Sequence, residues 1–421
     1  MTDAREAEGL DHRGRVRVAI TGLGVKTAAG TDLATFWSKL TAGQSTAAGI
    51  SRYDPSDLPV RFGCEVSDFD PTQYLGAKEA RRVDRVTQLG FAAAADALAD
   101  AGEHGCDPSR SAVIVGTGVG GLITLEEQVT IYAEKGASRV SPFLVPMMMA
   151  NATAGTIAMQ FGWKGPNFCV ATACAASANA IGEAARLVRY GEADIVMTGG
   201  SESCLTPTAI SAFARMTALS TRNDDPAHAS RPFDADRDGF VMGEGASALV
   251  LERWDRAVAR GAHIYGELVG YGRNADAYHI TAPSPGGEGA AACMQLALDY
   301  AGLSPADIGH VNAHGTSTPL NDAAEAEAIH KVFGASLPPV TSTKGVTGHL
   351  IGASGATEAI ACLLTFQHGE APPTANLEHL GEEIALDVIA GTPRKLAPAP
   401  ALSNSFGFGG HNATLVLAPP S

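Results

Sequence analysis

Residues 168–201 read FCVATACAASANAIGEAARLVRYGEADIVMTGGS, and this stretch decides the fold class of the 421-residue chain. An apolar run is followed by a cysteine among small residues, by apolar positions at helical spacing, and by a second apolar run. This order predicts a strand, a helix that begins near Cys174, and a second strand. Because a helix N-terminus favours thiolate over thiol, the pattern predicts a nucleophilic cysteine with a lowered pKa. The competing interpretation is a small core residue, which is the common role of a cysteine among alanines.

The composition indicates a globular protein with reduced thiols. Hydrophobic residues make up 45% of the chain and charged residues 18%, which is enough apolar material for a large core. Residues 1–15 are polar and charged, so we expect a flexible tail and not a signal peptide. The seven cysteines include no CxxC pair, which speaks against a disulfide framework or a cysteine zinc site. We therefore expect a cytoplasmic protein.

Charge and hydropathy exclude two kinds of partner. The formal net charge of −15 argues against nucleic acid, because phosphate binding needs clustered Lys and Arg. Residues 140–163 carry no charge and are long enough to cross a bilayer as a helix. Pro142 and Pro146 interrupt this segment, so we expect no membrane span. We expect instead a buried loop and helix in a subunit interface or a substrate pocket.

One pattern of elements occurs twice along the chain. DALADAG (96–102) before SAVIVGTG (111–118) matches LALDYAG (296–302) before IGHVNAHGT (308–316), and RYGEA (189–193) matches QHGEA (367–371). We expect strands at 16–20, 111–115, 194–198, 247–251, 264–270, 308–312 and near 340, helices at 32–40, 82–101, 290–301, 323–333 and 352–367, and a turn at 21–24. Strands that alternate with helices predict a buried parallel or mixed sheet, here in two similar packed halves, residues 16–260 and 261–421.

Two histidines of the second half stand in distinctive settings. His314 directly follows an expected buried strand, and active sites of α/β folds lie at such strand ends. His349 precedes a Gly-rich helix start, where the helix dipole would keep its imidazole neutral. A thiolate with such partners can form and transfer thioesters. Either histidine alone is more commonly structural.

Five segments together resemble the signatures of the β-ketoacyl synthase family. They are ATACAAS (171–177), RPFDADRDGFVMGEGA (231–246), AHGTSTPLND (313–322), STKGVTGHLIGASG (342–355) and NSFGFGGHNA (404–413). With TGLG at 21–24 they span nearly the whole chain in the family's order. The resemblance implies the thiolase-like α/β fold, in which duplicated halves form a five-layered αβαβα sandwich, usually in a dimer.

The same resemblance implies an activity and roles for single residues. Cys174 would carry an acyl group that condenses with malonyl-acyl carrier protein, with loss of carbon dioxide, extending a fatty-acid or polyketide chain by two carbons. His314 and His349 would promote decarboxylation and stabilise the enolate, and Lys344 would orient His349. The backbone N–H groups of Cys174 and Phe408 would form the oxyanion hole, with the Phe408 ring as a gate. Further implied assignments are a network of Asp322 and Glu325, pantetheine contacts at Thr316 and Thr318, an acyl pocket of Val119, Phe213, Met147 and Met148, and carrier docking at Lys78, Arg81 and Arg82, with Arg139 and Arg215 as possible additions.

The resemblance also implies partners: an acyl carrier protein that brings substrates on its phosphopantetheine, no other cofactor, and a second ketosynthase subunit or a chain-length factor. Ordinary structural roles stay open for the less specific residues, namely a solvated face for the basic cluster, core packing for the methionines and surface charges for Asp322 and Glu325.

Several alternatives stay open for the activity. GTGVGG (116–121) fits the GxGxxG of dinucleotide-binding enzymes, although no clean βαβ return follows it. A chain-length factor would share the fold but lack the nucleophile. A thiolase would need a further cysteine near the C-terminus, where none follows Cys362. The pathway, the chain length of the substrate and the binding of a structural cation are not decided by the residues.

Overall fold

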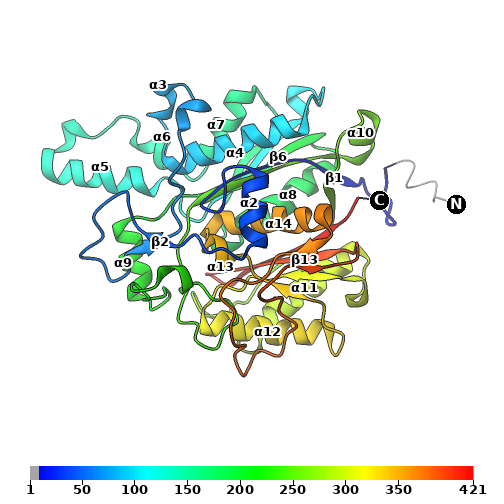
Figure 1. The fold of residues 1–421 in the computed structure, drawn as a ribbon. Helices are drawn as coiled ribbons and strands as arrows, with labels where there is room; N and C mark the ends of the chain where they lie inside the picture. Colours follow the sequence, from blue (N-terminus) through cyan, green and yellow to red (C-terminus); the bar gives the residue numbers. More distant parts are fainter. Residues whose placement is uncertain (1–8, 421) are drawn as a thin grey trace.

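The computed structural model describes residues 9–420 (Figure 1). Within them, ten strands follow the order β10-β9-β13-β14-β8-β1-β7-β6-β4-β5. The first half contributes β1 (Val18–Thr27), β4 (Ser111–Gly116), β5 (Asn167–Val170), β6 (Ile195–Glu202) and β7 (Gly245–Arg253). The second half contributes β8 (Gly266–Ala275), β9 (His310–Asn312), β10 (Val340–Thr341), β13 (Ala401–Gly407) and β14 (His411–Ala418). Between the two halves, β1 meets β8 over the pairs Ala19–Glu267 and Ile20–Gly266.

Both halves use one pairing scheme. β4 lies parallel to β5 and β6, and β9 lies parallel to β10 and β13. β7 runs antiparallel to β1 and β6, as β14 does to β8 and β13. The duplication expected from the matching letters is therefore present in the strand order itself.

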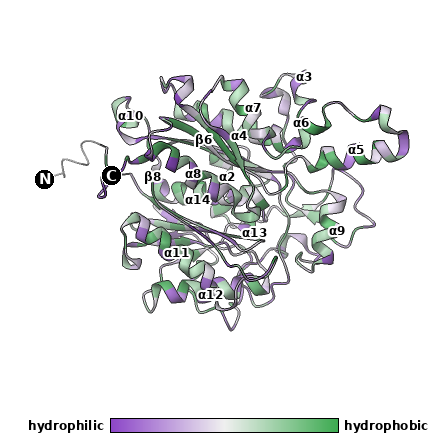
Figure 2. Cartoon of the chain, turned by 180° about the vertical axis from the view of Figure 1, so that it is seen from behind, coloured by the Kyte–Doolittle hydropathy of each residue, from purple (hydrophilic) through white to green (hydrophobic). Residues whose placement is uncertain are grey.

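Helices form three layers around the two sheet halves, which confirms the αβαβα sandwich (Figure 1). α4 (Arg85–Ala101) and α7 (Ala152–Phe161) pack on the first half, and α11 (Glu288–Ala301) lies on the second with α12 (Pro319–Phe333) beside it. Figure 2 shows α8 (Ala176–Arg189) and α14 (Ser354–His368) between them. Residues 354–365 are all buried, as expected for a helix that is covered by sheets on two sides.

The segment Thr21–Gly24 is strand and not the expected turn. β1 continues to Thr27 with an irregularity in its pairing near Gly22. A Cβ atom at Gly22 would lie 2.1 Å from the carbonyl oxygen of Ala97, and one at Gly24 2.1 Å from that of Ala93. These glycines therefore serve the close approach of α4 to the sheet, which a sequence pattern cannot distinguish from turn chemistry.

The described part of the expected N-terminal tail, residues 9–15, is packed on the rest of the molecule. Residues 1–8 lie outside the described residues. Leu10 forms an antiparallel bridge with Val16, and the Arg15 guanidinium donates to the Tyr300 carbonyl at 2.9 Å. Arg15 also lies 4.2 Å from the centre of the Tyr300 ring. Arg15 is therefore packed against the second half, whereas Gly9 lies against Asp255 of the first.

The uncharged segment 140–163 forms short helices and loops. α6 (Leu144–Met148) and α7 lie here, after α5 (Leu122–Lys135), which projects from the body of the molecule (Figure 1). Val145 is 60% exposed and Met159 75%, so this apolar surface is not buried within one chain. In the described part of the chain, no helix has the length and apolar character needed to cross a bilayer. The remaining α-helices of residues 9–420 are α2 (Leu33–Thr41), α3 (Ala77–Ala80), α9 (Pro207–Arg215), α10 (Trp254–Ala259) and α13 (Lys344–Thr347).

Candidate active site

A strained turn holds Cys174 at the centre of the molecule. After β5 the chain forms a single 3-10 turn, Ala173–Ala175, and then enters α8. Ala173 has a φ of 49°, in the left-handed region that costs a non-glycine residue energy. Gly407 of β13 packs directly against this turn, because a Cβ there would lie 3.0 Å from the backbone nitrogen of Cys174. Strand, turn and helix together fix the position of the sulfur.

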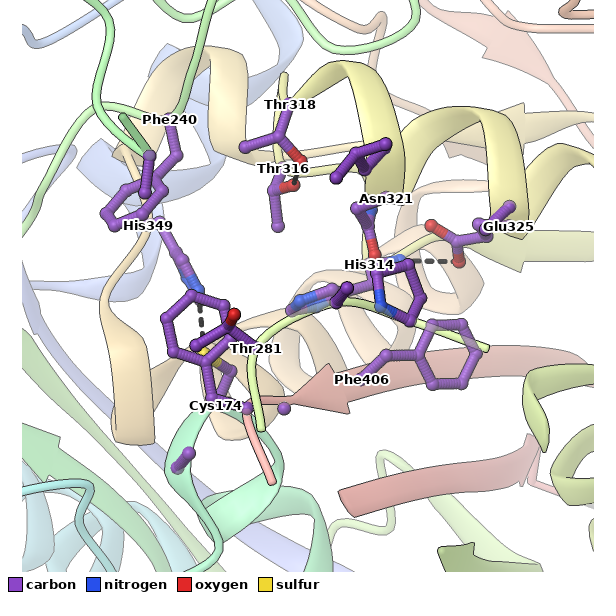
Figure 3. Close-up of a pocket in the computed structure, with 18 of the residues that line it drawn as sticks. Cys174, Phe240, Thr281, His314, Thr316, Thr318, Asn321, Glu325, His349 and Phe406 are labelled. Atoms are coloured by element: carbon purple, nitrogen blue, oxygen red, sulfur yellow. Dashed lines mark hydrogen bonds between the residues drawn. The ribbon is translucent and has the colours of Figure 1, made fainter. Parts of the chain in front are cut away.

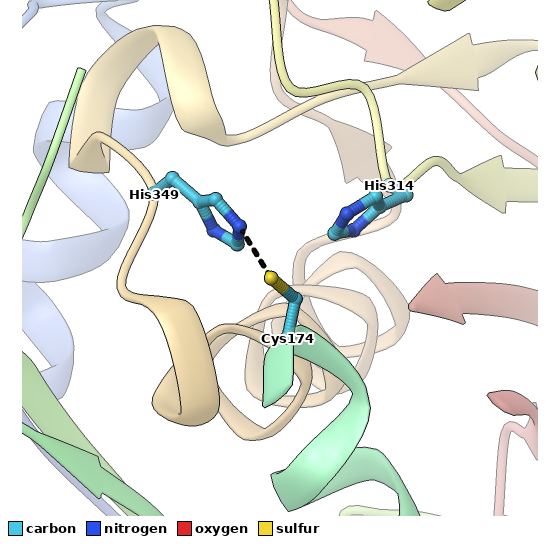
Figure 4. Close-up of side chains that lie close together, drawn as sticks. All are labelled: Cys174, His314 and His349. Atoms are coloured by element: carbon cyan, nitrogen blue, oxygen red, sulfur yellow. Dashed lines mark hydrogen bonds between the residues drawn. The ribbon is translucent and has the colours of Figure 1, made fainter. Parts of the chain in front are cut away.

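The structure brings the predicted cysteine and both predicted histidines together. His349 Nε2 lies 3.1 Å from Cys174 Sγ (Figures 3 and 4). Its Nδ1 lies 2.9 Å from Ser354 Oγ. The centres of the His314 and His349 rings are 5.4 Å apart, with the rings nearly perpendicular. Sγ and one nitrogen of each imidazole lie within 4.8 Å of one another. One half supplies the sulfur and the other supplies both rings.

Asp322 and Glu325 hold the backbone that carries His314. The Glu325 carboxylate accepts from the N–H groups of His314 at 2.8 Å and Gly315 at 2.7 Å. Asp322 accepts from the N–H of Thr316 at 2.9 Å. Both carboxyls project from α12 and are fully buried, which raises the pKa of Asp322 and brings that of Glu325 to about 7. These acids are therefore parts of the site scaffold and not surface charges at a helix start.

Lys344 lies behind the histidines in a buried ion pair. Its Nζ contacts the Glu358 carboxylate and donates to the carbonyl oxygen of His314. Both charged side chains are at most 2% exposed. Glu358 was missed in the sequence analysis, although it is the one charged residue in the apolar helix sequence SGATEAIACLLTF (354–366), and that is a usable signal.

The expected low pKa of Cys174 is wrong for the free site. Burial raises the pKa of the Cys174 thiol to about 12, against the opposing effects of the Lys344 charge and of the backbone N–H of Phe408. Desolvation outweighs the helix end, because the sulfur is almost completely removed from water. Burial and then the Lys344 charge place the pKa of His349 well below its ordinary value. The histidine is neutral as expected, although burial and not the helix dipole is the main cause.

The backbone N–H groups expected for an oxyanion hole belong to Cys174 and Phe408, and both residues line the cavity. Both N–H groups lower the pKa of the thiol, so they favour negative charge beside the sulfur. Phe408 belongs to the turn between β13 and β14, which Gly409 and Gly410 make possible with φ values of 84° and 72°. The ring of Phe408 lies 6.4 Å from that of Phe213, centre to centre.

A cavity of about 710 Å³ leads to these groups. Its lining includes most of the residues expected for the acyl pocket, the pantetheine arm and the gate, namely Val119, Phe213, Thr316, Thr318 and Phe408. Met216, Phe240 and Ile351 also line the cavity, and the sequence analysis missed them. The hydroxyls of Thr316 and Thr318 lie 2.9 Å apart (Figure 3). Met147 and Met148 do not line the cavity of this chain. Their backbone packs behind Gly121, where a Cβ would lie 2.3 Å from the carbonyl oxygen of Met147.

Comparison with known proteins agrees with this geometry. Residues 15–257 match the family model "Beta-ketoacyl synthase, N-terminal domain", and residues 265–378 match "Beta-ketoacyl synthase, C-terminal domain". The chain belongs to the β-ketoacyl synthase family. A protein of Synechocystis sp. named 3-oxoacyl-[acyl-carrier-protein] synthase 2 is 51% identical over 407 residues, 95% of this chain and 97% of that protein. A protein of Staphylococcus aureus with the same name is 45% identical over 408 residues, 96% of this chain and 98% of that one.

Solved structures of ketosynthases share the fold. The ishigamide ketosynthase/chain length factor has a TM-score of 0.91 at 35% identity and covers 97% of this chain and 100% of its own. A type II polyketide ketosynthase in complex with its acyl-carrier protein, AntDE:AntF, has a TM-score of 0.89 at 31% identity, with 97% and 100% coverage.

The glycine-rich segment of this ketosynthase is not a dinucleotide site. The N–H of Gly118, which a phosphate would need, already donates to the buried carboxylate of Glu202 at 2.6 Å. Glu202 also accepts from the N–H of Gly352 at 3.1 Å and from the hydroxyl of Thr117 at 3.0 Å. The N–H that a phosphate would need is therefore already used by Glu202, which argues against a dinucleotide site at this turn.

The basic cluster expected for carrier docking is at the surface of the ketosynthase. Lys78, Arg81 and Arg82 are exposed, and no ion pair holds any of them among residues 9–420. The Arg82 guanidinium lies 5.0 Å from the centre of the Phe143 ring. The cluster thus borders the exposed apolar surface of segment 140–163.

Proposed function

We propose that this ketosynthase catalyses the decarboxylative Claisen condensation of an acyl group on Cys174 with malonyl-acyl carrier protein, and so extends a fatty-acid or polyketide chain by two carbons. It is an elongating acyltransferase of the 3-oxoacyl-[acyl-carrier-protein] synthase type, as its sequence relatives are named. The observation that carries the proposal is one sulfur and two neutral imidazoles within 4.8 Å, at the end of a cavity large enough for an acyl chain.

Acyl transfer begins with a neutral thiol, since burial raises its pKa. Ser354 Oγ accepts the Nδ1–H of His349, so that Nε2 presents its lone pair to the thiol at 3.1 Å. As Sγ attacks the thioester carbon of the acyl carrier, Nε2 takes the thiol proton. The N–H groups of Cys174 and Phe408 stabilise the oxyanion. The carrier thiolate then leaves and takes the proton from His349, which restores the neutral imidazole.

Condensation needs hydrogen-bond donors for the enolate, and it takes up one proton only when the Cys174 thiolate is released. When malonyl thioester loses carbon dioxide, the electrons of the broken C–C bond form an enolate whose oxygen is negative. Nδ1 of His314 has no hydrogen-bond partner among the described residues, so this ring is free to donate to the enolate. His349 donates as well once it is in the Nε2–H tautomer, in which the Ser354 hydroxyl donates to Nδ1. The enolate carbon attacks the acyl carbonyl, and Cys174 leaves as the thiolate. That thiolate regains a proton from solvent.

We propose further that Lys78, Arg81 and Arg82 dock an acidic acyl carrier protein. Three exposed cations without ion-pair partners, in a chain of net charge −15, are the kind of patch that steers an acidic protein. Since a carrier brings the substrate, no cofactor beyond its phosphopantetheine is needed, and a cytoplasmic location suits such a partner. Neutralising the three cations should raise KM for the carrier and leave the reaction with small thioesters unchanged.

The exposed apolar face is proposed to bind a second subunit of the same fold. β5 forms the edge of the sheet, and Phe168 on it is 40% exposed. Val119, which lines the cavity, is 46% exposed, so the cavity wall is incomplete in one chain. An apolar edge strand is a pairing site for another strand. The partner is either a second copy or a chain-length factor, and the mass in solution with and without a coexpressed partner decides between them.

Mass spectrometry of the intact protein tests the main proposal. After incubation with acyl carriers of graded chain length, the wild type and Cys169→Ala should gain one acyl mass, and Cys174→Ala should gain none. His314→Ala should still be acylated but fail to release carbon dioxide from malonyl carrier. Acylation of Cys174→Ala would refute the assignment of the nucleophile. Saturated chains favour a role in fatty-acid synthesis, whereas acceptance of poly-β-keto chains only with a partner subunit favours a polyketide role.

A further inference from the structure

The three reactive side chains also form a set of metal ligands. Within residues 9–420, Cys174, His314 and His349 are the one group of three or more His, Cys, Asp or Glu side chains whose ligand atoms are close enough to hold an ion. One thiolate and two imidazoles form a donor set that Zn²⁺ and related soft divalent ions prefer over hard ions. The fourth position of a tetrahedral site would be free for water.

The spacing of the ligand atoms is close to what a tetrahedral ion requires. With Zn–S of about 2.3 Å and Zn–N of about 2.0 Å, two ligand atoms on one zinc lie about 3.5 Å apart. The pair His349 Nε2 and Cys174 Sγ is at 3.1 Å, and no pair in the set exceeds 4.8 Å. Side-chain rotations that move these ligand atoms by about 1 Å would therefore bring all three to tetrahedral spacing. The cavity of about 710 Å³ provides an entry path and room for the water.

The surroundings orient the ligands as they do in protein metal sites. Ser354 Oγ lies 2.9 Å from Nδ1 of His349, which directs the other nitrogen at the ion. Nδ1 of His314 is buried and has no hydrogen-bond partner within the described residues, so it has no protein contact to give up. The nearby Lys344 cation is compensated by Glu358, so it does not repel a cation with its full charge.

We propose that the acyl-free ketosynthase binds one soft divalent cation through Cys174 Sγ, His349 Nε2 and a ring nitrogen of His314, and that this cation excludes acyl transfer. The thiol proton passes to solvent, the sulfur donates its lone pair to the ion, and no electron is transferred. Because the same sulfur cannot hold both an acyl group and the ion, acylation and metal binding are mutually exclusive. The inhibitory part rests on the proposed function, whereas binding of the ion rests only on the three side chains.

Cadmium is the probe, because a thiolate–Cd²⁺ bond gives a charge-transfer absorption in the ultraviolet. The full-length protein is treated with chelator, exchanged into chelator-free buffer and titrated with Cd²⁺. Zn²⁺ is then added to displace the bound Cd²⁺ and so measure its relative affinity. We expect one ion per chain and loss of the absorption in Cys174→Ala. Binding should weaken by at least about 10- to 100-fold in His349→Asn and His314→Asn, since loss of a ligand costs no less than loss of an outer-shell partner. The control variants are Cys169→Ala, which removes a partly buried thiol, and His279→Ala, which removes an exposed ring. Both should bind Cd²⁺ as tightly as the wild type does.

Pre-acylation of the wild type should abolish the absorption, and chelator should restore acylation to the metal-bound enzyme. Circular dichroism of each variant shows whether it is folded. No cadmium absorption in folded wild type, or an unchanged absorption in folded Cys174→Ala, overturns the metal site. Cadmium binding at Cys174 in an enzyme that cannot be acylated would overturn the proposed function and leave the metal site standing.

Discussion

Removing the hydroxyl of Ser354 should slow acyl transfer while the protein remains folded. In Ser354→Ala, Nδ1 of His349 loses its partner at 2.9 Å in a place where water does not replace it, since both residues are at most 2% exposed. A buried polar group left unsatisfied costs about 1–3 kcal/mol. The neutral ring then has no fixed tautomer, and part of the population presents N–H instead of a lone pair to the thiol.

That cost corresponds to a reduction of about 5- to 150-fold in the acylation rate, with a central expectation near 10-fold. Quenched-flow mass spectrometry with a saturating acyl carrier measures this single step. Since Ser354 is a positioning residue, KM for the carrier should stay unchanged while the rate constant falls. The pH at which acylation reaches half its maximum should also shift, which a purely structural defect would not produce.

Thr198→Val is the matched control. The Thr198 hydroxyl in β6 is also buried, and it has no hydrogen-bond partner among the described residues. Its removal should leave both acylation and the melting temperature unchanged or raise the latter slightly. Wild-type acylation by Ser354→Ala, together with a wild-type melting temperature, would show that His349 does not act as the base through the geometry seen here.

Three further predictions concern the scaffold of the site. Lys344→Met leaves Glu358 buried without its partner, so it should lower the free energy of unfolding by about 3–5 kcal/mol in a denaturant titration. The double variant Lys344→Met/Glu358→Gln should recover most of this stability without regaining activity. Gly407→Ala places a Cβ 3.0 Å from the Cys174 nitrogen and should cut the acylation rate by about 100-fold, because it displaces the oxyanion N–H. Gly155→Ala, which has open space around it, should leave the acylation rate unchanged. Equal acylation rates in the two variants would contradict the packing argument. Burial raises the pKa of Glu202 to about 7, above its unfolded value, so its contribution to stability is complete below pH ~4.5 and is lost as the pH rises through about 7. The free energy of unfolding of Glu202→Gln relative to wild type should therefore increase by up to about 3 kcal/mol from pH 5 to pH 8. A difference that does not depend on pH would show that Glu202 ionises normally.

The sequence predicted the elements and the chemistry better than it predicted the environment. Periodicity and the matching letters located most of the duplicated strands and helices, because both halves bury them in the same way, but they missed β13 and β14, where the sequence indicates a Gly-rich turn. The pattern around Cys174 placed it correctly at a helix start but gave the wrong direction for its pKa. A helix end is a local feature that sequence displays, whereas desolvation comes from residues far along the chain, such as Phe240 and Ile351. Gly22 and Gly24 were misassigned for a similar reason, since the partner that requires them is α4.

The duplication also explains why one chain forms a single nucleophilic site. The counterpart of the turn Ala173–Ala175 before α8 is the turn Ile351–Ala353 before α14, and both contain a strained residue, with φ of 49° at Ala173 and 47° at Ile351. Gly352 stands where the first half has Cys174. Its N–H, which could otherwise have contributed to an oxyanion hole, donates to Glu202 at 3.1 Å. The second turn therefore lacks a nucleophile and has its donor filled by a carboxylate, and the second half contributes its histidines to the first half's sulfur.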